Sequence, residues 1–206
     1  MDSFNFFSSF CLAIGLSAAC GFRVFVPPLI YGIFYKANFV ELSDSWSWIG
    51  NDWIIILLTV ASIIEILSTF IPLIDNLLDI IATPASIIAG TILSFSSLSN
   101  LDPGLQWLLS IICGLGVTSF FQISTVSLRA FFTTFSGGLL NPFFAFIEDI
   151  LTIFISISSI LIPIIGLIIV IIMSLLIYFL IKKIKSKKKL KGNKFFRQTK
   201  VHFRNL

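Results

Sequence analysis

Apolar segments about as long as a bilayer crossing recur along the chain, and this restricts its fold more than any other feature. Of the 206 residues, 57% are hydrophobic and only 12% are charged, and the mean hydropathy is +1.03. A soluble domain carries about a quarter charged residues, whereas a helix needs about 20 mostly apolar residues to cross the hydrocarbon core. The sequence therefore predicts an all-α polytopic membrane protein and disfavours a soluble enzyme, a disordered chain and a coiled coil.

Six transmembrane helices are expected, with broken or re-entrant segments between some of them. Pro27 and Pro28 interrupt the first apolar segment, and the twelve residues 24–35 are too short to cross as a helix. Irregular backbone at membrane depth requires protein or trapped water to satisfy its polar groups. The expected spans are residues 6–22, 53–71, 84–98, 105–132, 142–162 and 163–181.

The charges are divided sharply between the body and the C-terminal segment. All ten acidic residues lie before residue 182, and eleven of the 14 Lys and Arg residues lie between Lys182 and Arg204. Basic residues next to a span stay cytoplasmic, so six spans place both termini in the cytoplasm. The sequence thus predicts a transmembrane domain over residues 1–181 and a basic cytoplasmic tail over residues 182–206. The tail is expected to bind anionic lipid headgroups, and nucleic acid is disfavoured because no nucleic-acid-binding fold accompanies the charge.

Two short segments suggest an internal repeat. Residues 21–25 and 127–131 both read small-apolar-Arg-apolar-Phe, and each follows a helix with small residues on one face. Such faces let helices approach closely in lipid. Those stripes are Ala13, Ser17 and Gly21 in the first case, and Ser110, Gly114, Thr118 and Gln122 in the second. Three spans in each half predict an inverted repeat of residues 4–99 and 105–181.

Charged residues inside the apolar segments are the candidate functional residues, because each costs at least about 2.5–3.5 kcal/mol to insert. They are Arg23, Glu65, Asp75, Asp79, Arg129, Glu148 and Asp149. Since the acids outnumber the arginines, some must be protonated, solvated or bound to a cation. One interpretation is a polar centre that binds an ion or relays protons. The alternative is that the charges form structural ion pairs, with Asp75 and Asp79 exposed to water and the two acids at 148 and 149 near a helix start.

The residues needed for the common types of catalysis are missing from the sequence. The single histidine, His202, lies in the basic tail, and the three cysteines, Cys11, Cys20 and Cys113, lie in apolar runs. The sequence carries no Ser-His-Asp set, Gly-rich phosphate loop or metal signature. We therefore expect no enzyme activity, no cofactor and no metal.

The chain resembles a bacterial integral-membrane family, the domain of unknown function 4126. The matching residues are the run from Gly15 to Pro27, then Glu65 with Pro72, Asp75, Asp79 and Pro84, and finally Asn141 and Pro142 with Glu148 and Asp149. The resemblance implies a small polytopic protein of no established activity, here expected in a bacterial inner membrane. The family pattern has a lysine and a serine where this chain has Thr125 and Ala145.

These observations favour a small transporter or permease-like protein. Its site would be lined by the seven charged residues, with ion- or proton-coupled passage where the two repeats meet. The alternative is a non-transporting scaffold or assembly factor whose basic tail recruits lipid or a partner. A homo-oligomer is compatible with either function.

Overall fold

A computed structural model describes the chain from residue 3 to residue 202, and every regular element in the described part is helical. Outside the description lie residues 1–2, 41, 43, 70–71, 138–140 and 203–206, and the side chains of residues 3–4, 44, 72–79, 132, 134–135 and 184–202. The prediction of an all-α protein is confirmed for the described residues.

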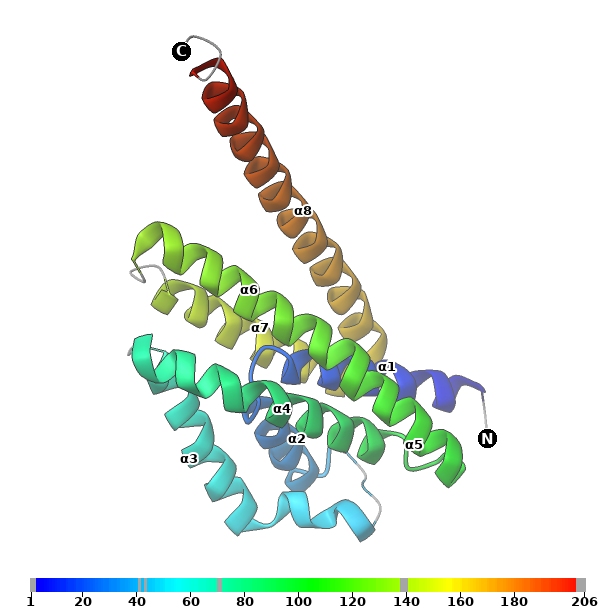
Figure 1. Cartoon of the computed structure of the whole chain (residues 1–206). Helices are drawn as coiled ribbons and strands as arrows, with labels where there is room; N and C mark the ends of the chain where they lie inside the picture. Colours follow the sequence, from blue (N-terminus) through cyan, green and yellow to red (C-terminus); the bar gives the residue numbers. More distant parts are fainter. Residues whose placement is uncertain (1–2, 41, 43, 70–71, 138–140, 203–206) are drawn as a thin grey trace. The chain divides into compact units, whose positions relative to one another are not determined.

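The helices follow one another with short connections (Figure 1). They are α1 (Ser3–Cys20), α2 (Val26–Lys36), the 3-10 helix η1 (Asp44–Gly50), α3 (Asp52–Ser68), α4 (Pro72–Ser97), α5 (Pro103–Ile111), the π-helix η2 (Ile112–Thr118), α6 (Ser119–Ser136), α7 (Asn141–Leu161) and α8 (Pro163–His202). The chain forms two compact units, Met1–Val170 and Ile171–Leu206.

Helix α1 is the centre of the first unit and packs against α4, α7 and η2 (Figure 1). Its contacts use the small residues that the sequence analysis identified. The Ser17 hydroxyl donates to the Gly90 carbonyl at 3.1 Å, and Thr118 donates to the Ser17 carbonyl at 2.8 Å. A Cβ added to Gly21 would lie 2.7 Å from the Thr118 carbonyl oxygen. The predicted small faces therefore form close helix contacts, as expected where lipid supplies no hydrophobic driving force.

The predicted break after the first helix is present, but its details differ. Helix α1 ends at Cys20, before Phe22, and residues 26–36 form a helix rather than an irregular apolar piece. Pro27 and Pro28 lie in the first turn of α2. There a missing N–H costs nothing and the fixed proline φ suits the helix. The prolines therefore start α2 instead of interrupting it.

Two helices are longer than the sequence suggested. Helix α4 begins at Pro72 and continues through Pro84, where we expected the span to begin. An interior proline is tolerated in membrane helices because neighbouring groups satisfy the freed carbonyl. Helix α8 continues through the lysine-rich segment to His202, although the span was expected to end at Ile181. Lysine is a good helix former, so the helix outlasts its apolar part.

Four of the described helical segments are long and apolar enough to cross a membrane. They are Ile80–Ser97, Pro103–Phe131, Asn141–Leu161 and Pro163–Lys183. The apolar part of α1, Asn5–Cys20, is shorter, and α3 has 17 residues. The structure thus supports a helical membrane protein with four such segments in its described part.

The two repeat segments differ in conformation. Arg23 lies in the link between α1 and α2, whereas Arg129 lies within the continuous helix α6. The five-residue similarity therefore does not correspond to one local structure.

Substitution of Gly114 is predicted to destabilise the protein more than substitution of Gly116 in the same π-helix. A Cβ at Gly114 would lie 2.9 Å from the Thr91 backbone nitrogen, whereas nothing lies within 4 Å of a Cβ at Gly116. We expect Gly114→Ala to lower the free energy of unfolding in detergent by about 1–3 kcal/mol. Gly116→Ala should leave it unchanged or raise it. Equal losses in both variants would contradict the close packing of η2 on α4.

Candidate functional site

Arg23 is buried in the link between α1 and α2 and reaches across to α7. It is 2% exposed, and its Nε donates to Oδ1 of Asp149 at 2.6 Å. Its Nη2 donates to the backbone carbonyl of Ala145, one turn earlier on α7, at 3.4 Å. A guanidinium group holds its charge at any ordinary pH, so burial requires such charge-assisted partners. The link is thereby held against α7.

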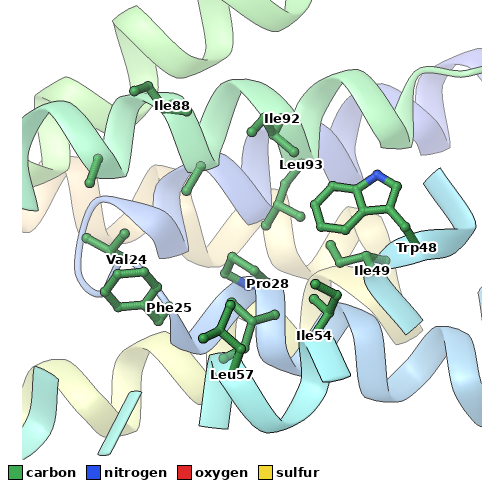
Figure 2. A pocket seen from close by; sticks show the side chains of 13 residues that line it. Val24, Phe25, Pro28, Trp48, Ile49, Ile54, Leu57, Ile88, Ile92 and Leu93 are labelled. Atoms are coloured by element: carbon green, nitrogen blue, oxygen red, sulfur yellow. The ribbon is translucent and has the colours of Figure 1, made fainter. Parts of the chain in front are cut away.

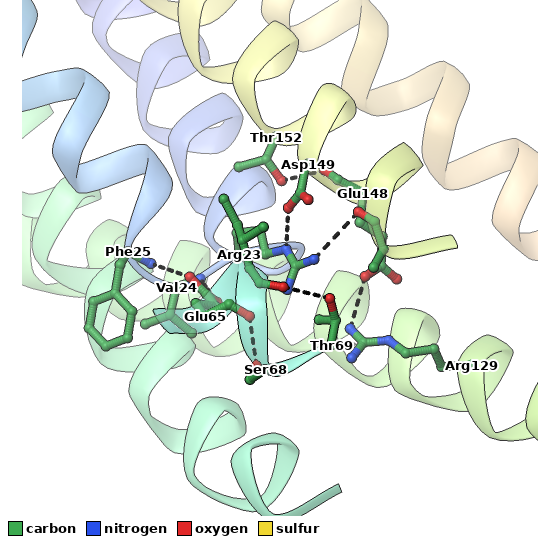
Figure 3. A network of polar contacts seen from close by, with 12 residues as sticks. Arg23, Val24, Phe25, Glu65, Ser68, Thr69, Arg129, Glu148, Asp149 and Thr152 are labelled. Carbon is green, nitrogen blue, oxygen red and sulfur yellow. Dashed lines mark hydrogen bonds and ion pairs between the residues drawn. The ribbon is translucent and has the colours of Figure 1, made fainter. Parts of the chain in front are cut away.

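The second buried arginine pairs with the neighbouring acid of the same helix. Nη2 of Arg129, on α6, lies 2.9 Å from Oε2 of Glu148, and both side chains are at most one-tenth exposed. Adjacent residues on a helix point in directions about 100° apart. The acid pair at 148 and 149 therefore engages two arginines that approach α7 from different elements (Figure 3).

Glu65 extends from α3 to the beginning of α2. Its Oε1 accepts the backbone N–H of Val24 at 2.7 Å, and its Oε2 accepts that of Phe25 at 3.1 Å (Figure 3). These N–H groups immediately precede the first residue of α2. A helix N-terminus leaves donors unsatisfied and favours negative charge. Among the described residues, Glu65 makes these two hydrogen bonds and no ion pair.

Five of the seven predicted site residues thus gather in one place, which we call the charge cluster. Its members are Arg23, Glu65, Arg129, Glu148 and Asp149. Asp75 and Asp79 lie in the first two turns of α4, and their side chains are outside the described residues. Glu148 and Asp149 lie two turns into α7 and pair with arginines, so they do not cap the start of that helix.

Sequence reasoning missed the backbone groups that complete the cluster, namely the N–H groups of Val24 and Phe25 and the carbonyl of Ala145. Side-chain chemistry gives no signal for such groups. It also missed the small-residue stripe of α4, where Ser94 lies 2.5 Å from the Ser17 hydroxyl. That stripe could have been found, because Ser86, Gly90 and Ser94 follow at intervals of four residues.

The charge cluster carries more negative than positive charge among its described groups. Two guanidinium groups face three carboxylates, so ionisation of all five leaves one excess negative charge. Coulomb repulsion and desolvation both penalise such an excess in an apolar surrounding. One proton or one cation would neutralise it. No group of three or more Cys, His, Asp or Glu residues arranged for a metal ion is found in the part of the chain that the structure describes.

Breaking the pair of Arg129 and Glu148 on one side is predicted to destabilise the protein strongly. Arg129→Met leaves a buried carboxylate without this partner, and we expect a loss of about 3–5 kcal/mol in the free energy of unfolding. The double variant Arg129→Met/Glu148→Met should lose much less than the sum of the two single variants. Chemical unfolding of the purified protein in detergent measures each value.

The pair of Lys36 and Asp52 provides the matched control, because its side chains are 55% and 74% exposed. Lys36→Met should change the free energy of unfolding by only about 0–1 kcal/mol. Additive losses at Arg129 and Glu148 would contradict a direct interaction between the two buried groups.

Comparison with known proteins gives one match. The family model for a domain of unknown function (DUF4126) matches residues 10–183. Neither a curated protein nor a solved structure matches the chain. The match spans α1 through the apolar part of α8 and includes every residue of the charge cluster.

Proposed function

The chain belongs to the DUF4126 family of domains of unknown function, and on this premise we propose that it is a small membrane transporter whose charge cluster takes up and releases one proton or cation. The observation that carries the proposal is that three carboxylates face two guanidinium groups among the described members of the charge cluster. A charge within a bilayer costs at least about 2.5–3.5 kcal/mol. A site with one excess charge therefore has a reason to bind a counter-charge and, because the gain is modest, to release it.

Glu65 is the exchanging group in this proposal. Glu148 and Asp149 each have a guanidinium partner within 3 Å, whose positive charge can balance theirs. Glu65 is held by two neutral backbone donors. The proton or cation that neutralises Glu65 would therefore be free to exchange. Arg23 and Arg129 would instead fix the positions of α6, α7 and the link after α1.

The proposed architecture has six spans arranged as an inverted repeat, with both termini in the cytoplasm of a bacterial inner membrane. Helices α1 and α3 would be the two short spans. Eighteen and 17 residues correspond to about 25–27 Å at 1.5 Å per residue. The hydrocarbon core is about 30 Å thick, so local thinning of the bilayer would accommodate them at modest cost.

Proton or cation flux in reconstituted vesicles tests the proposal. We expect the wild type to move protons, or Na⁺, down an imposed gradient faster than empty vesicles do. Glu65→Gln should reduce that flux to the level of empty vesicles. Glutamine keeps an acceptor for the α2 donors but loses the exchangeable charge. Glu65→Asp should restore part of the flux.

Asp52→Asn is the matched control, because Asp52 is an exposed carboxylate on the same helix. Its flux should equal that of the wild type. Wild-type flux no faster than that of empty vesicles for both ions would refute transport and favour the scaffold alternative. Wild-type flux in Glu65→Gln would remove Glu65 from the mechanism.

Single-cysteine labelling tests the six spans, starting from a variant without the three buried native cysteines. Asn51 precedes α3, Gly104 lies in the first turn of α5, and a Cβ at Gly104 meets no atom within 4 Å. Six spans place Asn51→Cys and Gly104→Cys on the outer face and Lys183→Cys on the inner face. A membrane-impermeant maleimide distinguishes the faces. Reaction of Asn51→Cys from the same face as Lys183→Cys would show that α1 to α3 do not cross as proposed.

A further inference from the structure

Two apolar cavities lie between α3 and α4 and share walls. One has a volume of about 320 Å³ and reaches from Val24 and Phe25 to Trp48 (Figure 2). The other has a volume of about 280 Å³ and reaches from the same two residues to Glu65. Ala85 lines both cavities. The cavities therefore adjoin where the link between α1 and α2 meets α4.

The lining residues follow helical spacing along both walls. On α3 they are Ile54, Leu57, Leu58, Ala61, Ile64 and Glu65. On α4 they include Ala82, Ala85 and Ala89, whose small side chains leave the space open. Because residues spaced by three and four share one helix face, the two cavities are parts of one groove, which we call the α3–α4 groove.

The length of the α3–α4 groove matches one leaflet of a bilayer. Residues 54 to 65 on α3 and 81 to 93 on α4 line it, which corresponds to about 17–18 Å of helix. Half of the hydrocarbon core is about 15 Å. Trp48 lies at one end (Figure 2), and indole rings favour the headgroup level. The groove thus extends from an interface to slightly beyond the bilayer midplane.

The chemistry of the walls selects a hydrocarbon ligand. Every residue that lines the α3–α4 groove is apolar except Glu65, which lies at its inner end. Leu57 and Ile88, one from each wall, are 63% and 60% exposed, so the groove is accessible from the lipid side.

A helix about 10 Å wide would need more than about 1,000 Å³ over this length. A helix of a second copy is therefore too large for these cavities.

We propose that the α3–α4 groove binds one acyl chain of a membrane phospholipid. The headgroup lies near Trp48 and the end of the chain lies near Glu65. The chain supplies the dispersion contacts that empty apolar walls lack. The proposal does not depend on transport, since it rests on the shape and lining of the groove.

Photo-crosslinking in vesicles tests the proposal. The probe is phosphatidylcholine with a diazirine near the end of one acyl chain, and peptide mass spectrometry identifies the labelled residues. Val24 and Ala82 line the cavity that reaches Glu65, where the end of a bound chain would lie, and Val24 is only 3% exposed, so lipid on the outer surface hardly reaches it. We expect both to be labelled in the wild type, together with the lipid-facing residue Val60, which is 50% exposed. Labelling of Val60 without Val24 and Ala82 would overturn the proposal.

Filling the groove provides the second test. Ala85→Trp should abolish labelling of Val24 and Ala82 while that of Val60 persists, and Ala89→Leu should reduce it with a smaller change in volume. The control is Ile123→Trp, because Ile123 is 60% exposed on α6 and does not line the groove. Undiminished labelling of Val24 in both folded groove variants would also overturn the proposal.

Discussion

The pairing of two buried arginines with neighbouring acids on α7 is the interaction on which the first compact unit depends. A guanidinium group cannot escape its charge by deprotonation, so Arg23 and Arg129 each require a carboxylate in an apolar surrounding. Asp149 and Glu148 satisfy that requirement from consecutive positions of one helix. As a result α7, α6 and the link after α1 have one favourable relative arrangement, which sets the position of the third carboxylate, Glu65.

The first compact unit is packed more tightly around α1 than around α3. The contacts of α1 with α4 and η2 are formed by glycine and small hydroxyl residues, with side chain-to-backbone hydrogen bonds such as that from Thr118 to Ser17. Helix α3 is attached more loosely, since only Ser62 and Ser68 among its residues are buried. The tightly packed core therefore carries the charge pairs, while the α3–α4 groove lies beside the loosely attached helix.

The helical class followed from the long apolar segments, and the break near Arg23 followed from the two prolines after it. Seven charged residues were predicted to share one site because polar groups are costly in lipid, and five of them are seen together in the described part of the chain. Sequence reasoning failed where local and tertiary preferences compete. Pro84 was expected at the start of a span but lies inside α4, and Pro27 and Pro28 were expected to interrupt an apolar segment but lie where α2 begins. The sequence also could not predict the ion pairs, because the positions of Glu148 and Asp149 do not indicate which arginine each of them contacts.

The five residues from Gly21 to Phe25 connect more elements than their length suggests. Within them, Arg23 contacts α7, the backbone of Val24 and Phe25 binds a side chain of α3, and Gly21 packs on α6 and η2. Connecting segments ordinarily tolerate insertions and deletions. Here the gain or loss of one residue would move Arg23 away from its partner on α7 and would also move the two N–H donors away from Glu65. Length variation should therefore be tolerated elsewhere in the chain, as at the turn near Gly104, and not in this segment.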